Sequence, residues 1–409
     1  MKRSITEKTV SALLAFAAII LSFGALAGCQ RAYAGGKLPT NARATDKKFA
    51  AAYTEFALEL LRGSAPEGQN ALISPLSVME ALAMTASGAG GVTLSEMLSV
   101  MGGIPTETLA AYLRAFSPDS RELSLANSIW IKNDFAVRGE FTKRASEMFG
   151  AGIYSTPFDA SGIKNVNSWV RGNTRGMIPE LVDGSTFGDA TMLCLINAIA
   201  FEGKWAAGYA DGAVGSGTFN REDGAAENVT MLRSSETRLI NVPGGIGFAK
   251  DYNGGRYSFV AILPDKGTKI ADFVASLDAA DLADALRNTK DGNIIARIPE
   301  FGAEYSADLG EILCGMGMPS AFRPGEADFS GISSDMGLYI DSVIHKTKFE
   351  LDRTGTKAAA ATSVTMNKYS APPERRAIYI TLDRPFVYMI IDGTTSLPVF
   401  IGTYAGAPD

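Results

Sequence analysis

Apolar and polar positions alternate at helical spacing in the first part of the chain that is expected to fold. Residues 46–62 and 74–89 carry apolar side chains at every third or fourth position, and the short apolar run 71–73 lies between them. This spacing predicts two helices separated by a short strand. Thr93 and Glu96 have the spacing of a capping box, which predicts the start of a further helix.

Strand patterns dominate after Arg121. Residues 139–149 and 166–178 still have helical spacing, but most other segments are rich in Val, Ile, Phe and Tyr. The segments with strand character are 123–131, 191–201, 258–265, 293–306, 339–352, 377–383, 385–392 and 397–405. Because helices are concentrated early and strands late, and no βα unit repeats, the sequence predicts an α+β domain with large sheets.

The stretch "GTKAAAATSVTMNKYSAPPE", residues 355–374, fits neither a helix nor an ordinary strand. Four consecutive alanines favour a helix, whereas the Thr, Ser and Val that follow favour a strand. With period two, one face is small and then apolar and the other small and then polar, which is typical of a half-buried strand. The stretch has no bulky residue near its start and ends in a basic, proline-containing segment. The pattern therefore predicts a strand that can lie outside a sheet. The first face consists of Thr356, Ala358, Ala360, Thr362, Val364 and Met366.

Composition narrows the class of protein. The chain has 409 residues, of which 46% are hydrophobic and 20% charged. This length allows two or three domains, but the composition fits one large core equally well and excludes disorder for most of the chain. The net charge of -6 and the lack of a basic patch with interleaved aromatic residues argue against nucleic acid as a partner.

The N-terminus resembles a bacterial lipoprotein signal. Lys2, Arg3 and Lys8 precede an apolar run, residues 10–26, and the sequence "LAGC" ends at Cys29. The resemblance implies a signal peptide over 1–28, lipid on Cys29, a tether over 29–46 and one folded domain over 47–409. It also implies an exported protein, lipid-anchored at the bacterial cell surface or envelope. An ordinary secretory signal with a chance cysteine, or a single membrane anchor, is the alternative.

Catalytic chemistry has little support in the sequence. The single histidine, His345, shares a period-two face with Val343, Thr347, Phe349 and Leu351, so it is expected to point toward the core. A hydrogen-bonded core histidine, a catalytic base and a polar structural switch all remain open for it.

Metal and redox chemistry have no sequence support either. No residues have metal-site spacing, and no cofactor is predicted. Cys194 and Cys314 are expected to be two buried free thiols rather than a bridge.

Eight segments, in this order, resemble the serpin family. They are "NALISPLSVMEALAMTASGAGGVTLSEML", "LANSIWI", "VNSWVRGNTRGMI", "LINAIAFEGKW", "ADFSGIS", "GTKAAAAT" and "DRPFVYMIID" with the later "PVFIGTY". The resemblance covers about residues 47–407 and implies an α+β serpin fold with three β-sheets, about nine helices and an exposed reactive-centre loop. It implies a monomer that is not an enzyme but inhibits serine, or else cysteine, proteases.

The resemblance also implies where the target protease acts. Residues 355–370 correspond to the reactive loop, whose cleaved segment inserts into the large sheet as a new strand. The loop length implies a scissile bond between Tyr369 and Ser370, and so a chymotrypsin- or subtilisin-like target. Lys368 is the alternative and would recruit trypsin-like enzymes. The hinge residues are Gly355, Thr356, Ala358, Ala359, Ala360, Ala361 and Thr362.

Residues that control insertion correspond as well. Ser74, Ser77, Asn197 and His345 match the family's polar cluster beneath the opening strands, and Trp205 matches the tryptophan where the loop enters. Without the resemblance, Ser74 would be interpreted as a helix N-cap.

Two positions depart from the family pattern. Arg353 and Lys357 stand where inhibitory members usually carry acids. A non-inhibitory serpin, a binding module whose loop is merely cleaved, is the alternative function.

Overall fold

The computed structural model describes residues 31–33, 47–65, 68–116, 121–150, 152–188, 191–335, 337–356 and 376–407. Within these ranges the chain forms nine α-helices and two short 3-10 helices, η1 (Asp211–Ala213) and η2 (Pro319–Phe322). The α-helices are α2 (Lys47–Ser64), α3 (Pro75–Ala86), α4 (Gly91–Val100), α5 (Thr106–Phe116), α6 (Gly139–Phe149), α7 (Ala160–Asn173), α8 (Ile270–Ser276), α9 (Ala279–Arg287) and α10 (Gly310–Met316).

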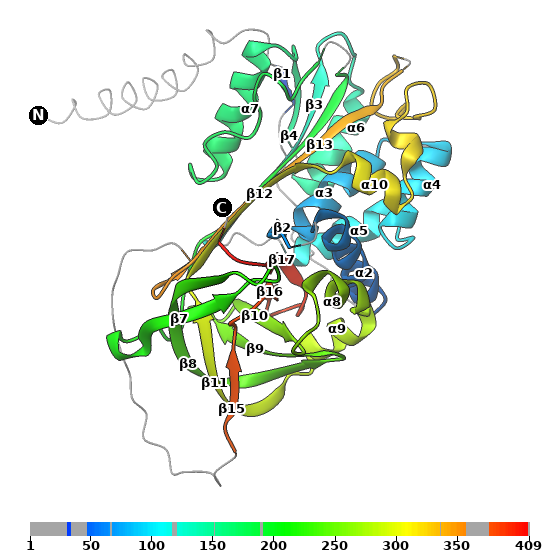
Figure 1. Ribbon diagram of the computed structural model, residues 1–409. Helices are drawn as coiled ribbons and strands as arrows, with labels where there is room; N and C mark the ends of the chain where they lie inside the picture. The colour runs from blue at the N-terminus through cyan, green and yellow to red at the C-terminus, as the bar shows by residue number, and fades with distance from the viewer. Residues whose placement is uncertain are drawn as a thin grey trace, which may run out of the picture.

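The described strands form two hydrogen-bonded sheets (Figure 1). The first has the order β1 (Arg31–Tyr33), β4 (Gly152–Thr156), β3 (Leu123–Lys132), β5 (Leu193–Phe201), β13 (Ile340–Leu351), β14 (Gly355–Thr356) and β6 (Gly203–Lys204), with β12 (Phe301–Asp308) also paired to β13. The second has the order β15 (Ile378–Thr381), β11 (Lys290–Pro299), β8 (Ala226–Val242), β9 (Gly245–Asp251), β10 (Tyr257–Pro264), β16 (Phe386–Asp392), β17 (Pro398–Tyr404) and β2 (Ala71–Ile73), with β7 (Val214–Asn220) paired to β8.

The described strands form two hydrogen-bonded sheets because one long strand, β8, joins regions that would otherwise be separate. β8 has 17 residues and pairs with β9 at one end and with β7 and β11 along the rest, so it joins two regions into one ladder. The expected α+β architecture with helices early and strands late is what the chain adopts. Three residues of the expected tether, those of β1, pair with β4 at the edge of the first sheet.

Helices cover both faces of the first sheet, and this explains the sequence of β5. Leu193, Leu195 and Ile199 belong to the large core cluster that contains α3. Cys194 and Ile196 belong to a second cluster beneath α7. Since alternate residues of a strand point to opposite faces, a strand covered on both sides is apolar throughout, as β5 is.

Several predicted boundaries were wrong. The helix predicted to begin at the Thr93–Glu96 box begins at Gly91, and its N-cap, Gly90, makes no side-chain hydrogen bond. Thr93 is buried and its Oγ1 accepts from the backbone N–H of Asp328, while Glu96 accepts from the N–H of Ser320. Both side chains serve tertiary contacts, which a local spacing rule does not see.

Two other segments also differ from their predictions. The helix predicted over 166–178 begins earlier, at the Asp159 cap, and ends at Asn173. The single strand predicted over 293–306 is two strands, because β11 belongs to the second sheet and β12 to the first. No helix in the described part of the chain is long and apolar enough to cross a membrane.

Candidate functional site

The centre of the first sheet is a seam between two parallel strands, β5 and β13. Val343 lies opposite Leu195, His345 opposite Asn197 and Thr347 opposite Ile199. The outer neighbours of these two strands are antiparallel to them: β3 pairs antiparallel with β5, and β12 pairs antiparallel with β13. A strand antiparallel to both sides of the seam would therefore fit between β5 and β13.

A tight hinge turn follows β13 at the end of the seam. The Asp352 carboxylate accepts from Thr354 N–H at 2.6 Å, from Thr354 Oγ1 at 2.7 Å and from Gly355 N–H at 3.0 Å. Asp352 N–H donates to Gly355 C=O at 2.9 Å. The chain thus reverses direction and enters β14, which pairs with β13 on one side and with β6 on the other.

Gly355 occupies a position that only glycine fits. Its φ of +148° lies where side chains are disfavoured, and a Cβ atom there would lie 2.2 Å from the Gly203 carbonyl oxygen and 2.6 Å from the Lys204 Cα. The close approach to β6 requires the absence of a side chain. The hinge glycine thus has a steric reason in this structure.

Trp205 holds the hinge turn from the side of β6. Its indole Nε1 donates to Asp352 C=O at 2.9 Å, and its backbone N–H donates to Thr354 C=O at 3.3 Å. The ring stacks on Tyr252 with centroids 4.5 Å apart. The predicted entry residue therefore contacts the first turn of the candidate inserting strand directly.

A buried cation supports this tryptophan. Lys250 Nζ lies 5.3 Å from the centre of the Trp205 ring and 4.7 Å from that of Tyr209, and it pairs with Glu236 at 3.1 Å. The Lys250 side chain is 4% exposed, so burial strengthens both the ion pair and the contact with the rings. Sequence reasoning missed this lysine, because nothing in "GFAKDY" marks it as buried.

The departure at Arg353 has a local explanation. Its backbone N–H donates to Glu300 Oε1 at 3.2 Å, and its guanidinium lies 3.8 Å from the Asp211 carboxylate. Both groups of this ion pair are more than half exposed, so the pair contributes little to stability. The Glu300 contact fixes the backbone of the turn, and it is compatible with a cation at this position.

The four residues of the predicted polar cluster lie together beneath the seam. Ser74 N–H donates to His345 Nε2 at 3.1 Å, and Ser77 Oγ lies 2.9 Å from Asn197 Oδ1. Ser77 Oγ also lies 2.8 Å from Asn127 Oδ1, on β3. A hydroxyl has one proton, so it donates to one of the two amides and the other must present its NH₂ group.

Ser74 also caps a helix, as the alternative interpretation had it. Its Oγ accepts from Ser77 N–H at 3.3 Å and donates to the Val399 carbonyl at 2.8 Å. Capping and membership of the cluster are therefore compatible. The N-terminus of α3 is fixed both to β13, through His345, and to β5, through Asn197.

His345 is a neutral core histidine in this arrangement. It is fully buried, and burial lowers its pKa to about 3. Its Nε2 accepts a backbone N–H, so the ring proton is on Nδ1. The nearby Ser74 hydroxyl donates to a carbonyl instead of to the imidazole, so the nucleophile-to-base contact of a hydrolase is not formed. The core-facing orientation agrees with the period-two pattern.

Cys194 and Cys314 are both free, but only one of these two is buried as expected. Cys194 is fully buried, and burial raises its pKa to about 12. Cys314 is only partly buried, because α10 is a seven-residue helix at the surface and turns Leu313, not its neighbour, inward. No cluster that could hold a metal ion occurs among the described residues.

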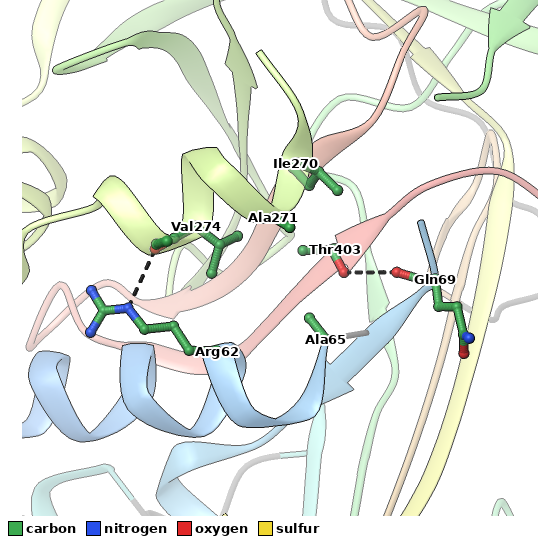
Figure 2. Close-up of a pocket in the computed structure, with 8 residues that line it drawn as sticks. Arg62, Ala65, Gln69, Ile270, Ala271, Val274 and Thr403 are labelled. Atoms are coloured by element: carbon green, nitrogen blue, oxygen red, sulfur yellow. Dashed lines mark hydrogen bonds between the residues drawn. The ribbon is translucent and has the colours of Figure 1, made fainter. Parts of the chain in front are cut away.

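A cavity of about 100 Å³ lies between α2, α8 and β17. Figure 2 shows side chains that line it. The Arg62 guanidinium beside it donates to the carbonyls of Val274 and Leu277 and pairs with Glu59. These bonds tie α2 to α8, and they occupy the charged group that a ligand would use. The cavity is lined by Arg62, Ala65, Gln69, Ile270, Ala271, Val274, Ala275 and Thr403.

Some predicted site residues lie outside the described ranges. These are Cys29, the small hinge residues Ala358, Ala359, Ala360, Ala361 and Thr362, and the residues of the predicted scissile bond, Lys368, Tyr369 and Ser370. The backbone of Gly355 and Thr356 is described, and it is the part of the predicted loop that joins the sheet.

Comparison with known proteins gives the family. The family model "Serpin (serine protease inhibitor)" matches residues 51–406. The chain belongs to the serpin family. A serpin-like protein of Thermococcus kodakarensis is 28% identical, over 89% of this chain and 87% of that protein. The leukocyte elastase inhibitor of Equus caballus is 28% identical, over 88% of this chain and 99% of the inhibitor.

Solved serpin structures agree with the fold. The thermophilic serpin tengpin in its native state has a TM-score of 0.84 and 35% identity, covering 91% of this chain and 97% of that one. The same protein in its latent state gives a TM-score of 0.77. This serpin is therefore more similar to the native form of tengpin than to the latent form. The relatives named as leukocyte elastase inhibitors, from Equus caballus and Mus musculus, agree with an inhibitory family.

Proposed function

We propose that this serpin traps serine endopeptidases, or else cysteine endopeptidases, by inserting its cleaved reactive loop between β5 and β13. The observation that carries the proposal is the register of β14. Thr356 lies opposite Leu351 of β13 on one side and opposite Gly203 of β6, beside β5, on the other. These two partners of Thr356 are 148 residues apart in the sequence. Val343 and Leu195, which face each other across the closed seam, have the same offset of 148.

The equal offsets mean that an inserting strand would need no sliding of its neighbours along their axes. In this register, residue 358 would lie between Phe349 and Phe201, and residue 362 between His345 and Asn197. The residues at alternate positions from 356 would share the face of Leu351, Phe349 and His345, which are buried. This is the small-then-apolar face of the sequence pattern.

Insertion would release free energy stored in the uncleaved protein. The backbone groups of the loop would gain two ladders of hydrogen bonds, and alternate side chains would become buried. At about 3.3 Å per residue, a strand of some fifteen residues carries its end roughly 50 Å. A protease joined as an acyl-enzyme at Tyr369 would be moved by that distance and pressed against the serpin body.

Such compression would stop the protease before it finishes its reaction. Hydrolysis of the acyl-enzyme requires groups positioned to within a fraction of an ångström, so a distorted active site deacylates slowly. The small residues from 358 to 361 favour this function over a binding module with a cleavable loop, because they enter between parting strands with few steric contacts.

One experiment tests the function and the site of attack together. We expect an SDS-stable complex with chymotrypsin- or subtilisin-like proteases, and a released C-terminal fragment that begins at Ser370. A fragment beginning at Tyr369, with trypsin-like enzymes, would assign Lys368 instead. Cleavage by every protease of the panel with no covalent complex would favour the non-inhibitory alternative.

We also propose that the protein is exported and anchored by lipid on Cys29, which the order of charged, apolar and small residues supports. Cys29→Ser is expected to prevent lipid attachment, so that the variant is released or accumulates unprocessed. The measurement is membrane fractionation with mass determination of the mature protein. Wild-type processing and membrane association of the variant would contradict lipidation.

A further inference from the structure

A carboxyl group lies in the core just beneath the polar cluster. Glu80 is three residues beyond Ser77 on α3, so the two side chains are neighbours on one helix face. Glu80 is 9% exposed, and its Oε2 has no hydrogen-bond partner among the described residues. No ion pair involves it in that part of the chain. A buried carboxyl without a counter-charge is costly when ionised.

The position of Glu80 matters because α3 fixes both sides of the seam. Ser74 N–H bonds to His345 on β13, and Ser77 bonds to Asn197 on β5. A strand that enters the seam would separate β5 from β13 by one further strand spacing, about 4.8 Å. At least one of these bonds must then break. Asn127 of β3, which is paired to Asn197, must move with β5.

We propose that Glu80 is a positioning residue for strand insertion: its neutral carboxyl keeps β3 and β5 seated on α3, and its ionisation promotes opening of the seam. This inference rests on the proposed function only for the purpose of seam opening, which is to admit the cleaved reactive loop. Opening itself is a property of the uncleaved protein.

The electrostatics give the sign of the effect. Burial raises the pKa of Glu80 to about 8, and the neighbouring Asn127 side chain partly offsets this. An opened seam hydrates the carboxyl and lets its pKa fall toward the ordinary value. The closed seam is therefore favoured fully at low pH, and this preference decreases as the pH rises toward 8. Above pH 8 the preference no longer changes with pH.

His345 and Cys194, two ionisable side chains of the seam strands, have pKa values outside this range. His345 stays neutral because its pKa is about 3, and Cys194 stays protonated because its pKa is about 12. None of the other ionisable residues on the elements packed against α3 bonds to Glu80. They are Lys47, Lys48, Tyr53, Glu55, Glu59 and Arg62 on α2, Glu96 on α4, Glu107, Tyr112 and Arg114 on α5, Lys132 on β3, Glu140, Lys143, Arg144 and Glu147 on α6, and Tyr404 on β17.

Hydrogen exchange of the uncleaved protein tests the proposal without any protease. Exchange rates of β5 and β13 peptides, corrected for intrinsic pH dependence, are compared at pH 6 and pH 8 in wild type and Glu80→Gln. We expect the wild-type equilibrium constant for opening to rise more than about fivefold, within the limit of tenfold per pH unit for one proton. In Glu80→Gln the change should be below about twofold, since no proton is gained or lost.

Two controls isolate the carboxyl. Glu107→Gln removes an exposed carboxyl on α5 and should keep the wild-type pH dependence, and β10 peptides in the second sheet should show none of it. Equal pH dependence in wild type and Glu80→Gln would overturn the proposal. Loss of protease trapping with this pH dependence intact would reject the proposed function and leave this inference standing.

A second variant applies if Glu80→Gln does not fold. Asn127→Ala removes the neighbour that partly offsets the burial of the carboxyl. The pH at which seam opening levels off should then move upward. An unchanged levelling point would overturn the role of Glu80.

Discussion

Single residues at the hinge are determined by contacts that a sequence pattern does not contain. Gly355 was expected to be a hinge glycine from resemblance, but the reason is its approach to the Gly203 backbone. The inward orientation of His345 followed from period two alone. Glu80, by contrast, lies in a helix whose residues are all buried, and spacing does not reveal what covers a helix face.

Substitution of the hinge glycine tests the close approach. Gly355→Ala places a Cβ atom against the Gly203 carbonyl in a backbone conformation that alanine avoids, so β14 should separate from β6. Such strain costs about 1–3 kcal/mol, and the melting temperature of the uncleaved protein should fall by several degrees. Gly208→Ala is the matched control, because a Cβ there meets only Arg353 O at 3.6 Å. Equal melting temperatures for both variants would contradict this account.

At the scale of elements, the sequence predicted whether a segment is a helix or a strand better than it predicted which strands pair. Helix α6 has the predicted bounds, and β5 and β13 lie within the predicted segments. The β-rich composition of both halves of 293–306 predicts one strand, yet the chain changes sheets at Glu300. Sheet membership depends on long-range pairing, which composition does not encode. The equal offsets across the seam likewise became visible only from the strand register.

The register predicts the effect of a charge at the start of the inserting strand. Thr356→Arg places a cation opposite Leu351, whose side chain is buried. Burying an unpaired charge costs at least several kcal/mol, and each 1.4 kcal/mol on the insertion barrier slows it about tenfold. Deacylation should then precede insertion, so that the variant is cleaved at the same bond but leaves the protease active.

The control for this variant keeps a cation on the other face. Lys357→Arg changes a position of opposite strand parity and should trap protease as the wild type does. The measurement is the number of serpin molecules consumed per protease molecule inhibited. A wild-type ratio for Thr356→Arg would contradict insertion of this segment.

At the scale of the whole molecule, the fold was predictable because separate motifs occur in a specific order. The α+β class also followed from helices early and strands late. The sequence does not give the conformational state of the molecule, because a polypeptide has the same sequence whether or not a further strand has joined its sheet. In the closed seam β5 pairs directly with β13, so no strand lies between these two.

Loop cleavage should therefore stabilise the protein strongly. About ten new ladder positions at roughly 1 kcal/mol each correspond to about 10 kcal/mol, which for a domain of this size raises the melting temperature by roughly 13 °C. The measurement is thermal unfolding of wild type before and after a single cut in the loop. Thr356→Arg cut at the same bond is the control and should gain much less, because its strand enters the seam poorly. If cleaved and intact wild type melt together, the new strand does not form and the closed seam is the end state.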